Sequence, residues 1–498
     1  MASKYQKPAP VVRVPFKPSY PPSAEQEVIF DALKNTKDNL HLEASPGSGK
    51  STTLCWSMTI DKTRSSAMVA FGKDICTDIE PKCAPHVTVA TFHSFGRRAL
   101  ASEFGNDLLL SNDMVKNLII KEYPYLDPFT AKEEDRGPAF SRMSSLLDLI
   151  DKLRVNLADE TNAEEVTSIA DQYNIDLDGS LIELLPNIFE KMIENPKVID
   201  FTSMIWLPVR MGLPNRKYDM IYMDERQDAN RMMIELIRQM SGSRIITVGD
   251  SNQAIMNFAG ADAKSTERLI ESFPGQELGL NTCYRCGTDI VALAATIWDK
   301  IKPYEKNHKG VIEYRDKIDM TMPEGSMIIS RRNANLIKPC FELLKSGRKA
   351  IIRGRDIGSG LILLINKLKA KGIVDLEYKI ERYRQDRIEK IMSRKDVKTE
   401  SIGVVNDQCD CIIAIAENCH DVADVKKKID TIFAADTKGI TLSSIHRSKG
   451  REAKMVTILD YSRVRLMHDR MTPTDVIQEK NLQFVALTRA MDTLHLIN

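Results

Sequence analysis

The chain has 498 residues, of which 43% are hydrophobic and 28% charged, and its formal net charge is +1. That length and apolar content allow more than one domain with its own core. The charge balance excludes bulk charge as the source of any nucleic-acid affinity, which would have to come from local grooves. No apolar run approaches the ~18 residues of a membrane span, no signal peptide is recognised, and the nine cysteines are scattered. We therefore expect a soluble protein in a reducing compartment.

The first 24 residues differ in composition from the rest of the chain. They hold six prolines and four basic residues, Lys4, Lys7, Arg13 and Lys17, before the first acid, Glu25. This composition predicts an extended arm (residues 1–24) that packs on the body of the protein, and the alternative is a role in binding nucleic acid.

Strand-like apolar runs fall into two groups along the chain. The first group is "NLHLEA", "AMVAFG", "HVTVATF", "DMIYMDE" and "RIITVGD", and the second is "SMIISR", "KAIIRG", "GITLSSIH", "AKMVTIL" and "TLHLI". Helical segments separate the runs, which favours two α/β domains with mainly parallel sheets. Each domain is interrupted by a mostly helical insertion. The expected boundaries are 25–100 with 196–275 for the first domain, 101–195 for its insertion, 276–365 with 432–498 for the second domain, and 366–431 for its smaller insertion.

The stretch "EASPGSGKST", residues 43–52, predicts a phosphate-binding turn between a strand and a helix. It departs from the G-x-x-x-x-G-K-[ST] pattern in having Ala44 at the first position. Backbone N–H groups of such a turn and the helix N-terminus bind phosphate, Lys50 would reach the β and γ phosphates, and Ser51 would ligate Mg²⁺. The alternative is a chance glycine-rich turn. The candidate nucleotide-binding residues of this stretch are Ala44, Ser45, Pro46, Gly47, Ser48, Gly49, Lys50, Ser51 and Thr52.

Two further strands end in polar residues that suit the same chemistry. The apolar strand of "YDMIYMDERQD" ends at Asp224 and Glu225. Asp224 suits Mg²⁺ coordination, and Glu225 suits deprotonating an attacking water, whereas the alternative is an acidic surface turn. A third strand ends at Gly249-Asp250, and Gln253, which follows it, would sense the γ-phosphate or the attacking water.

The cysteines raise the question of a zinc site. Cys283 and Cys286 form a CxxC, and a second group is made up of Cys409, Cys411 and Cys419 near His420. Neither group has a second pair at zinc-ligand spacing, so the spacing disfavours metal.

Seven motifs then occur in a recognisable order. They are "PSAEQEVIF" before the phosphate turn, "AFGKD", "TFHSFG", "DERQD", "NTCYRC", "SIHRSKGREAKMV" and "QFVALTRAMDTLHLI". Together with the phosphate turn they resemble those of superfamily 1 helicases of the UvrD/Rep type, over nearly the whole chain. Alanine is common at the first position of the turn in that family. Two residues depart from its pattern, Ala259 in place of the usual arginine and Met256 in place of the usual tyrosine.

The resemblance implies two RecA-like P-loop domains with ATP and Mg²⁺ bound between them. Gln26 would read adenine and Glu452 would accept a ribose hydroxyl. Arg285 and Arg489 would stabilise the phosphoryl-transfer transition state when the domains close. For Arg489 the alternative is a structural ion pair. The catalytic set is thus Lys50, Asp224, Glu225, Gln253, Arg285 and Arg489.

The resemblance also implies contacts to single-stranded DNA. Phe71, Phe92 and Phe258 are candidates for stacking on bases, with a place in the core as the alternative for each. The residues expected along the DNA backbone are Thr91, His93, Ser444 and His446.

We therefore expect an ATP-dependent DNA helicase or single-strand translocase that acts on single-stranded and tailed duplex DNA. The third motif at Gln253-Ala254-Ile255 and the fifth at Ser448-Lys449-Gly450 resemble the 3′ to 5′ branch. The expected setting is the cytoplasm, near the nucleoid or in a phage host, with replication or recombination proteins as partners and no membrane. Two alternatives are an ATPase that works as a switch or loading factor without unwinding, and a small-molecule kinase. The kinase is disfavoured because it would not need the two arginines or the fifth motif.

Overall fold

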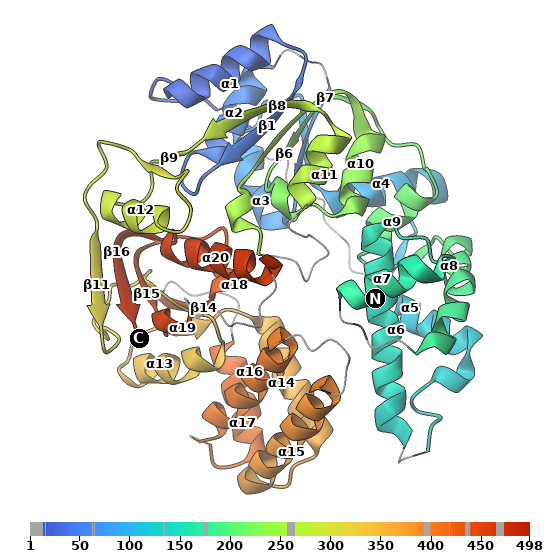
Figure 1. Cartoon of the computed structure of the whole chain (residues 1–498). Helices are drawn as coiled ribbons and strands as arrows, with labels where there is room; N and C mark the ends of the chain where they lie inside the picture. Colours follow the sequence, from blue (N-terminus) through green and yellow to red (C-terminus); the bar gives the residue numbers. More distant parts are fainter. Residues whose placement is uncertain are drawn as a thin grey trace. The chain divides into compact units, whose positions relative to one another are not determined.

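The computed structural model describes residues 13–14, 16–61, 63, 65–132, 135–173, 175, 178–255, 264–392, 399–417, 419–433, 439–464 and 473–498. The chain forms two compact units (Figure 1). The first unit comprises residues 1–45 and 49–280, and the second comprises residues 281–498 together with residues 46–48.

The first unit is built on a six-stranded sheet whose neighbouring strands are all parallel. Its order is β3 (Val87–Thr91), β2 (Ser66–Ala70), β6 (Tyr218–Met223), β7 (Ser241–Gly249), β1 (Asn39–Ala44) and β8 (Gly275–Leu280). Alternate side chains of each strand enter different cores, as the period of two requires. In β6, Tyr222 packs with α1 (Ala24–Asn35) and α2 (Lys50–Ile60), whereas Ile221 packs with helices of the opposite face. Figure 1 shows α1 and α2 together in blue on one side of these strands.

Helices on the opposite face continue into the first insertion. α4 (Phe92–Phe104), α9 (Ser203–Arg210) and α10 (Arg231–Met240) pack on the sheet, and α3 (Lys73–Ile79) and α11 (Ser265–Ser272) flank it. Between α4 and α9 the chain forms α5 (Met114–Glu122), α6 (Arg136–Asn156), α7 (Ala163–Gln172) and α8 (Leu185–Glu194), with short strands β4 (Leu109–Leu110) and β5 (Val198–Ile199). The insertion and the sheet share one hydrophobic core, in which the ring of Phe189 lies 5.4 Å from that of Trp206.

The second unit is built on a second six-stranded parallel sheet. Its order is β11 (Val311–Arg315), β16 (Ala490–Ile497), β15 (Ala453–Ile458), β12 (Met327–Ser330), β14 (Ile440–Ser444) and β13 (Ala350–Ile352). The other elements of the domain are β9 (Thr282–Cys283), β10 (Lys302–Pro303), α12 (Thr288–Ala295), α13 (Ala334–Lys345), α18 (Ile445–Ser448), α19 (Tyr461–Val464) and α20 (Pro473–Leu487).

A second group of helices interrupts this unit. It consists of α14 (Arg355–Leu368), α15 (Ile373–Met392), α16 (Thr399–Ala416) and α17 (Val422–Ile432), whose apolar side chains share a core with β12, β14 and α13. Polar contacts add to this packing. Asp410 of α16 accepts hydrogen bonds from Arg332, which comes after β12, and from Arg384 of α15, the latter at 2.7 Å. Asp407 of α16 accepts the N–H groups of Asn333 and Ala334 at the start of α13.

The predicted fold class is confirmed. All ten strand-like runs form strands of the two sheets. Two edge strands, β8 and β11, were not predicted, and β8 extends the first sheet past residue 275, where the first domain was expected to end. Within the described part of the arm, Arg13 pairs with Glu80 at 2.7 Å. The N–H groups of Val14 and Phe16 donate to the carbonyls of residues 81 and 82. In the residues that the structure describes, no helix is long and apolar enough to cross a membrane.

Candidate active site

The phosphate turn has the backbone that its sequence requires. β1 ends at Ala44, which is fully buried, and α2 begins at Lys50. Gly47 and Gly49 have φ values of 69° and 86°, in the left-handed region that favours glycine. Lys50 donates from Nζ to the carbonyl of Ala44 at 3.3 Å, while Ser51 is exposed and Thr52 half-buried in the first turn of α2. The turn therefore presents a helix N-terminus and a lysine at the carboxyl end of the sheet.

Gln26, the expected adenine-reading residue, contacts the helix that begins at the turn. It completes a capping box with Ser23 at the start of α1, and its Nε2 donates to Thr53 Oγ1 at 2.9 Å. Thr53 in turn donates to the carbonyl of Gly49 at 3.0 Å. Gln26 is thus fixed beside the phosphate turn, with its side-chain amide held by contacts inside the protein.

The acidic pair lies where its strand ends. Asp224 is buried directly after β6, and its carboxylate accepts the N–H of Glu225 at 2.9 Å. Glu225 has φ 52° and ψ 43°, and its carboxylate accepts a hydrogen bond from Gln227 Nε2 at 2.5 Å. Gln227 Oε1 accepts the N–H of Asp250 at 3.0 Å, so a single amide joins the turn after β6 to the turn after β7.

Gln253 lies in that second turn. Its Nε2 donates to the Asp250 carboxylate at 2.7 Å, and both side chains are buried. Burial raises the pKa of Asp250 to about 6, against the opposing effects of Lys50 and of the Gln253 hydrogen bond. The turns after β1, β6 and β7, three adjacent strands, therefore carry Lys50, Glu225 and Gln253 at the same edge of the sheet.

The residues of this edge fit a nucleotide triphosphate with Mg²⁺. The Ser48 hydroxyl of the turn is buried and has no hydrogen-bond partner within the described part of the chain, so it offers an unused donor. Lys50, Ser51 and Asp224 supply the cation, the hydroxyl and the carboxylate that a phosphate–metal pair needs.

The two candidate arginines both lie in the second unit. Arg285 comes after β9, and its Nη2 contacts the Glu452 carboxylate at 2.8 Å, so the residue expected at the ribose forms an ion pair here. Arg489 lies in the turn between α20 and β16, with 1% of its surface exposed. It donates to the carbonyls of Val485 and Arg451 at 2.9 and 3.1 Å. Each arginine is thus held by neighbours of its own unit.

The two segments expected to touch DNA in the first unit contain half-buried and buried aromatic rings. Phe92 is fully buried, so it has the core position that was the alternative to stacking on a base. To stack on a base, its ring would have to leave that core. Phe71 is half-buried, with its ring 5.1 Å from that of Phe92. Thr91 caps α4 by accepting the N–H of Ser94 at 3.2 Å. Burial lowers the pKa of His93, which favours its neutral form.

The corresponding residues of the second unit lie at the end of β14. Ser444 is buried and precedes α18, on which His446 lies. Burial, aided by the charge of Arg331, lowers the pKa of His446 to about 4, so that it is neutral at physiological pH. Phe258, Met256 and Ala259 lie outside the described residues.

Comparison of the sequence with known protein families tests the resemblance to UvrD/Rep helicases. The model of the UvrD/REP helicase N-terminal domain matches residues 25–274, half of the 498-residue chain. The chain belongs to the UvrD/Rep helicase family. The predicted resemblance is therefore confirmed.

Three relatives of this UvrD/Rep member illustrate its range of similarity. It is 24% identical to the F-box DNA helicase protein 1 of Schizosaccharomyces pombe over 95% of this chain and 57% of that protein. It is 25% identical to the ATP-dependent DNA helicase PcrA of Bacillus subtilis over 49% of this chain and 35% of that protein. It is 30% identical to the ATP-dependent DNA helicase srs2 of Schizosaccharomyces pombe over 25% of this chain and 15% of that protein. In each case the alignment spans less than two thirds of the relative's length.

The structure of this UvrD/Rep member brings forward one residue that sequence reasoning missed. Phe201, between β5 and α9, is 54% exposed, and its ring stands edge-on to His93 with the centroids 5.9 Å apart. An exposed ring beside a segment expected to touch DNA is a stacking candidate. In the sequence, Phe201 is marked only by its position between an apolar pair and the start of a helix. That signal is too weak to single it out.

The CxxC of the UvrD/Rep chain is a buried thiol pair on either side of Arg285. The side chain of Asn307 donates to the carbonyls of Cys283 and Cys286 at 3.1 and 2.9 Å, which closes the turn. The interaction between the two thiols lowers the pKa of Cys283 and raises that of Cys286. Across the residues described, no group of three or more His, Cys, Asp or Glu side chains is arranged to hold a metal ion.

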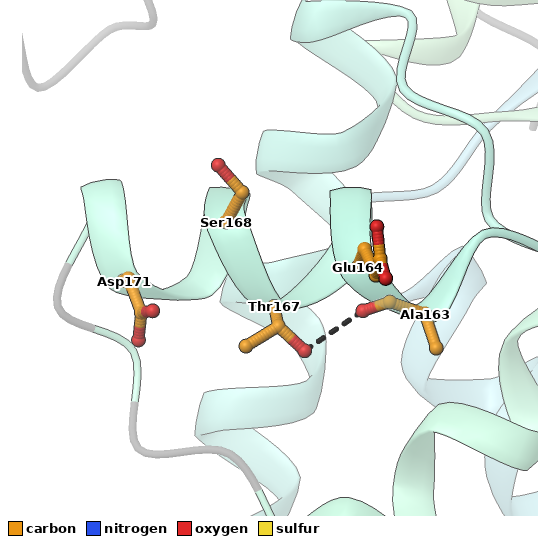
Figure 2. A pocket seen from close by; sticks show the side chains of 5 residues that line it. All are labelled: Ala163, Glu164, Thr167, Ser168 and Asp171. Carbon is orange, nitrogen blue, oxygen red and sulfur yellow. Dashed lines mark hydrogen bonds between the residues drawn. The ribbon is translucent and has the colours of Figure 1, made fainter.

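A hollow of about 510 Å³ lies over α7 in the helical insertion, apart from the phosphate turn (Figure 2). It is lined by Ala163, Glu164, Thr167, Ser168 and Asp171, all on one helix. Thr167 donates to the carbonyl of Ala163 at 2.8 Å, and none of these residues belongs to a family motif. The hollow therefore plays no part in the candidate active site.

Proposed function

We propose that this UvrD/Rep family member is an ATP-driven DNA helicase or single-strand translocase that moves 3′ to 5′. The observation that carries the proposal is the adjacency of β6, β7 and β1, whose succeeding turns bear Glu225, Gln253 and the phosphate turn with Lys50. In parallel α/β sheets, ligands bind at the carboxyl ends of the strands. The direction rests on the resemblance of the third and fifth motifs to the 3′ to 5′ branch.

In this mechanism each residue has one task. Lys50 and the N–H groups at the start of α2 bind the phosphates, and Gln26 orients the adenine. Glu225 takes the proton from the attacking water, and Gln253 senses the γ-phosphate. Mg²⁺, when bound by Ser51 and Asp224, supplies positive charge against the transferred phosphoryl group.

The second RecA-like domain would supply the transition-state charge. Arg285 would leave Glu452 and bind phosphoryl oxygens instead. Arg489 would likewise leave the backbone carbonyls that hold it and bind phosphoryl oxygens. Because both exchanges would require domain closure, hydrolysis would depend on that closure. We assign the first RecA-like domain to residues 25–100 and 196–280 and the second to residues 281–365 and 432–498, each with the helical insertion that interrupts it. Closure would move a strand held by Phe71, Phe201, Thr91 and His93 in one domain and by Ser444 and His446 in the other.

The test begins with ATP hydrolysis by the full chain, with and without single-stranded DNA. We expect stimulation by DNA, and then strand displacement on a duplex with a 3′ tail and little on one with a 5′ tail. Glu225→Gln is the control, because it should abolish both activities. Preferential displacement on the 5′-tailed duplex would reverse the direction. DNA-stimulated hydrolysis without displacement would instead support a switch or loading factor.

A further inference from the structure

Arg226 is a buried cation in the middle of the acidic turn. It lies between Glu225 and Gln227, begins the short helix η5 (Arg226–Asp228), and has 1% of its surface exposed. Its Nη2 donates to Glu43 Oε2 at 2.5 Å. Its Nε and Nη1 are buried and have no hydrogen-bond partner among the residues that the structure describes. Within that part of the chain, the Glu43 carboxylate is therefore the acceptor that holds this guanidinium.

Glu43 binds a second turn with the same carboxylate. It precedes Ala44 at the end of β1, and it accepts the N–H of Ser251 at 2.8 Å and the Ser251 hydroxyl at 3.0 Å. Ser251 begins the short helix η6 (Ser251–Gln253), which carries Gln253. Glu43 thus joins the turn after β6 and the turn after β7 to the strand that leads into the phosphate turn.

Gly249 makes this connection sterically feasible. β7 lies between β6 and β1, so the Arg226 side chain must cross the end of β7 to reach Glu43. A Cβ at Gly249 would lie 2.6 Å from Arg226 Cγ and 2.3 Å from Gln227 Oε1. Any larger residue there would displace both side chains.

The energetics argue against a role in stability alone. A buried guanidinium with two donors that no described residue accepts carries a large desolvation cost. A well-packed apolar residue in place of a buried ion pair is often as stable or more so. The effect of a buried pair of this kind is to fix the positions of the groups around it relative to one another.

We infer that Arg226 and Glu43 are positioning residues for ATP hydrolysis, an inference that rests on the proposed function. Glu225 directly precedes Arg226 and is held by Gln227, whose amide also binds the turn after β7. The orientation of the Glu225 carboxylate therefore depends on the alignment of both turns, which the Arg226–Glu43–Ser251 contacts set. Misplacement of a catalytic group by about 1 Å costs on the order of 10²-fold in rate.

The test compares Arg226→Met, which removes the charge at similar length, with Arg226→Lys, which keeps it. We measure kcat and KM for ATP with saturating single-stranded DNA, and the thermal unfolding midpoint, for the full chain. For Arg226→Met we expect kcat to fall about 10- to 100-fold. KM should stay within about threefold, because the phosphate turn is intact. The midpoint should change little, because the buried member of the pair is the one replaced and Glu43, which is 24% exposed, keeps its two hydrogen bonds from Ser251. Arg226→Lys should recover part of kcat. The matched control is Arg238→Met, which removes an exposed arginine of α10 paired with Glu235 and should change nothing.

Glu43→Gln provides an independent second variant. It should reproduce the loss of kcat, and the double variant with Arg226→Met should be no slower than the worse single one, because both remove the same contact. Full kcat in Arg226→Met would overturn the inference while leaving the proposed function standing. A joint loss of kcat, ATP binding and thermal stability would also overturn it, in favour of a structural role. A wild-type chain without ATPase activity would contradict the proposed function, and this inference with it.

Discussion

Glu225 has a left-handed backbone conformation, φ 52°, although it carries a Cβ. Such a conformation costs on the order of 1 kcal/mol for a residue other than glycine, and it persists only where the surroundings hold it in place. Here the Gln227 amide binds its carboxylate and the Asp224 carboxylate binds its N–H. This strain at the candidate base is what a preorganised side chain requires.

Glu225→Gln should keep ATP binding and lower the rate of hydrolysis by about 10²- to 10⁴-fold, since it removes a general base and leaves the phosphate turn intact. Equilibrium binding of a fluorescent ATP analogue and steady-state hydrolysis check the two halves of this prediction. Lys50→Ala is the comparison, because it should abolish hydrolysis by weakening the phosphate contact. Loss of binding in Glu225→Gln as severe as in Lys50→Ala would show that Glu225 is not the base.

The protonation of Asp250 makes the free energy of unfolding of the first unit depend on pH. Its folded-state pKa of about 6 lies above the usual 3.8, so between these values the folded state binds more protons than the unfolded state. The contribution of Asp250 to the free energy of unfolding should therefore fall by up to about 3 kcal/mol as pH rises from 4 to 6, and it should stay low above pH 6.

The measurement is the free energy of unfolding of the wild type minus that of Asp250→Asn, from pH 4 to 7. We expect this difference to fall with rising pH. Asp107→Asn, followed down to about pH 2, gives the opposite sign, because Lys197 lowers the pKa of Asp107 below its usual 3.8, so its contribution should fade as pH falls below about 4. A pH-independent difference for Asp250→Asn would mean that the pKa of Asp250 is the same in the folded and unfolded states.

At the residue scale, the sequence predicted the candidate functional groups that stand at the ends of apolar strands. Asp224 and Glu225 were found because an apolar strand ends in two acids, and β6 ends there. Phe201 and the Arg226–Glu43 contact were not found, because each depends on residues brought together from distant segments. The burial of Phe92 depends on the core that its helix α4 shares with α9, which the motif "TFHSFG" does not encode.

Helices α4 and α9 approach closely at Gly96. A Cβ there would lie 2.1 Å from the carbonyl oxygen of Met204, a backbone atom that cannot move aside alone. Gly96→Ala should therefore destabilise the protein by about 1–3 kcal/mol or more through overpacking. It should also disturb Thr91, which caps α4, and His93 in the first turn of α4.

Gly360→Ala is the matched substitution, because Gly360 lies exposed in α14 with nothing within 4 Å of an added Cβ. It should stabilise by roughly 0.5–1 kcal/mol through helix propensity. Thermal unfolding of both variants checks the contrast. Equal effects of the two alanines would contradict the close approach of α4 and α9.

Asp410 of α16 holds two arginines of different elements, Arg332 and Arg384. Asp410→Ala should lower the free energy of unfolding of the second unit by about 1–3 kcal/mol, because it leaves two partly buried cations without this partner. Chemical denaturation monitored by circular dichroism measures the loss. Glu381→Ala removes the 50%-exposed partner of the same Arg384 and should cost less than about 1 kcal/mol. A loss from Glu381→Ala as large as that from Asp410→Ala would contradict the assignment.

At the element scale, the ten predicted strands have apolar runs because helices cover them, and this holds also for the edge strands β3 and β13, whose residues are mostly buried. β8 and β11 lie at the sheet edges and leave most of their residues partly or fully exposed, as with Gln276, Glu277 and Tyr314. An edge strand needs no continuous apolar run, so its sequence resembles a loop. These two segments form strands because β8 pairs with β1 and β11 pairs with β16 through backbone hydrogen bonds.

At the scale of the whole molecule, a net charge of +1 predicts that DNA affinity depends on local contacts to phosphates. The logarithm of the affinity for single-stranded DNA should fall linearly with the logarithm of salt concentration, with a slope of about −0.7 for each phosphate neutralised. Titration of a fluorescent oligonucleotide at several salt concentrations measures that slope. The affinity should vary little with base composition, since stacking on aromatic rings tolerates every base. A slope near zero would exclude a phosphate-binding groove.

The first insertion shares its core with the sheet, and this sets which of its residues are free to change. Leu146, Leu149 and Leu153 of α6 are buried with the helices that cover the sheet, whereas Phe129 and Phe140 at the outer end are 65% and 39% exposed. Mutations at the buried end are subject to selection for folding, whereas those at the outer end escape it. The outer end is accordingly the place where related genes can diverge, and where a reporter peptide can be spliced in or a library of side chains screened without disturbing the shared core.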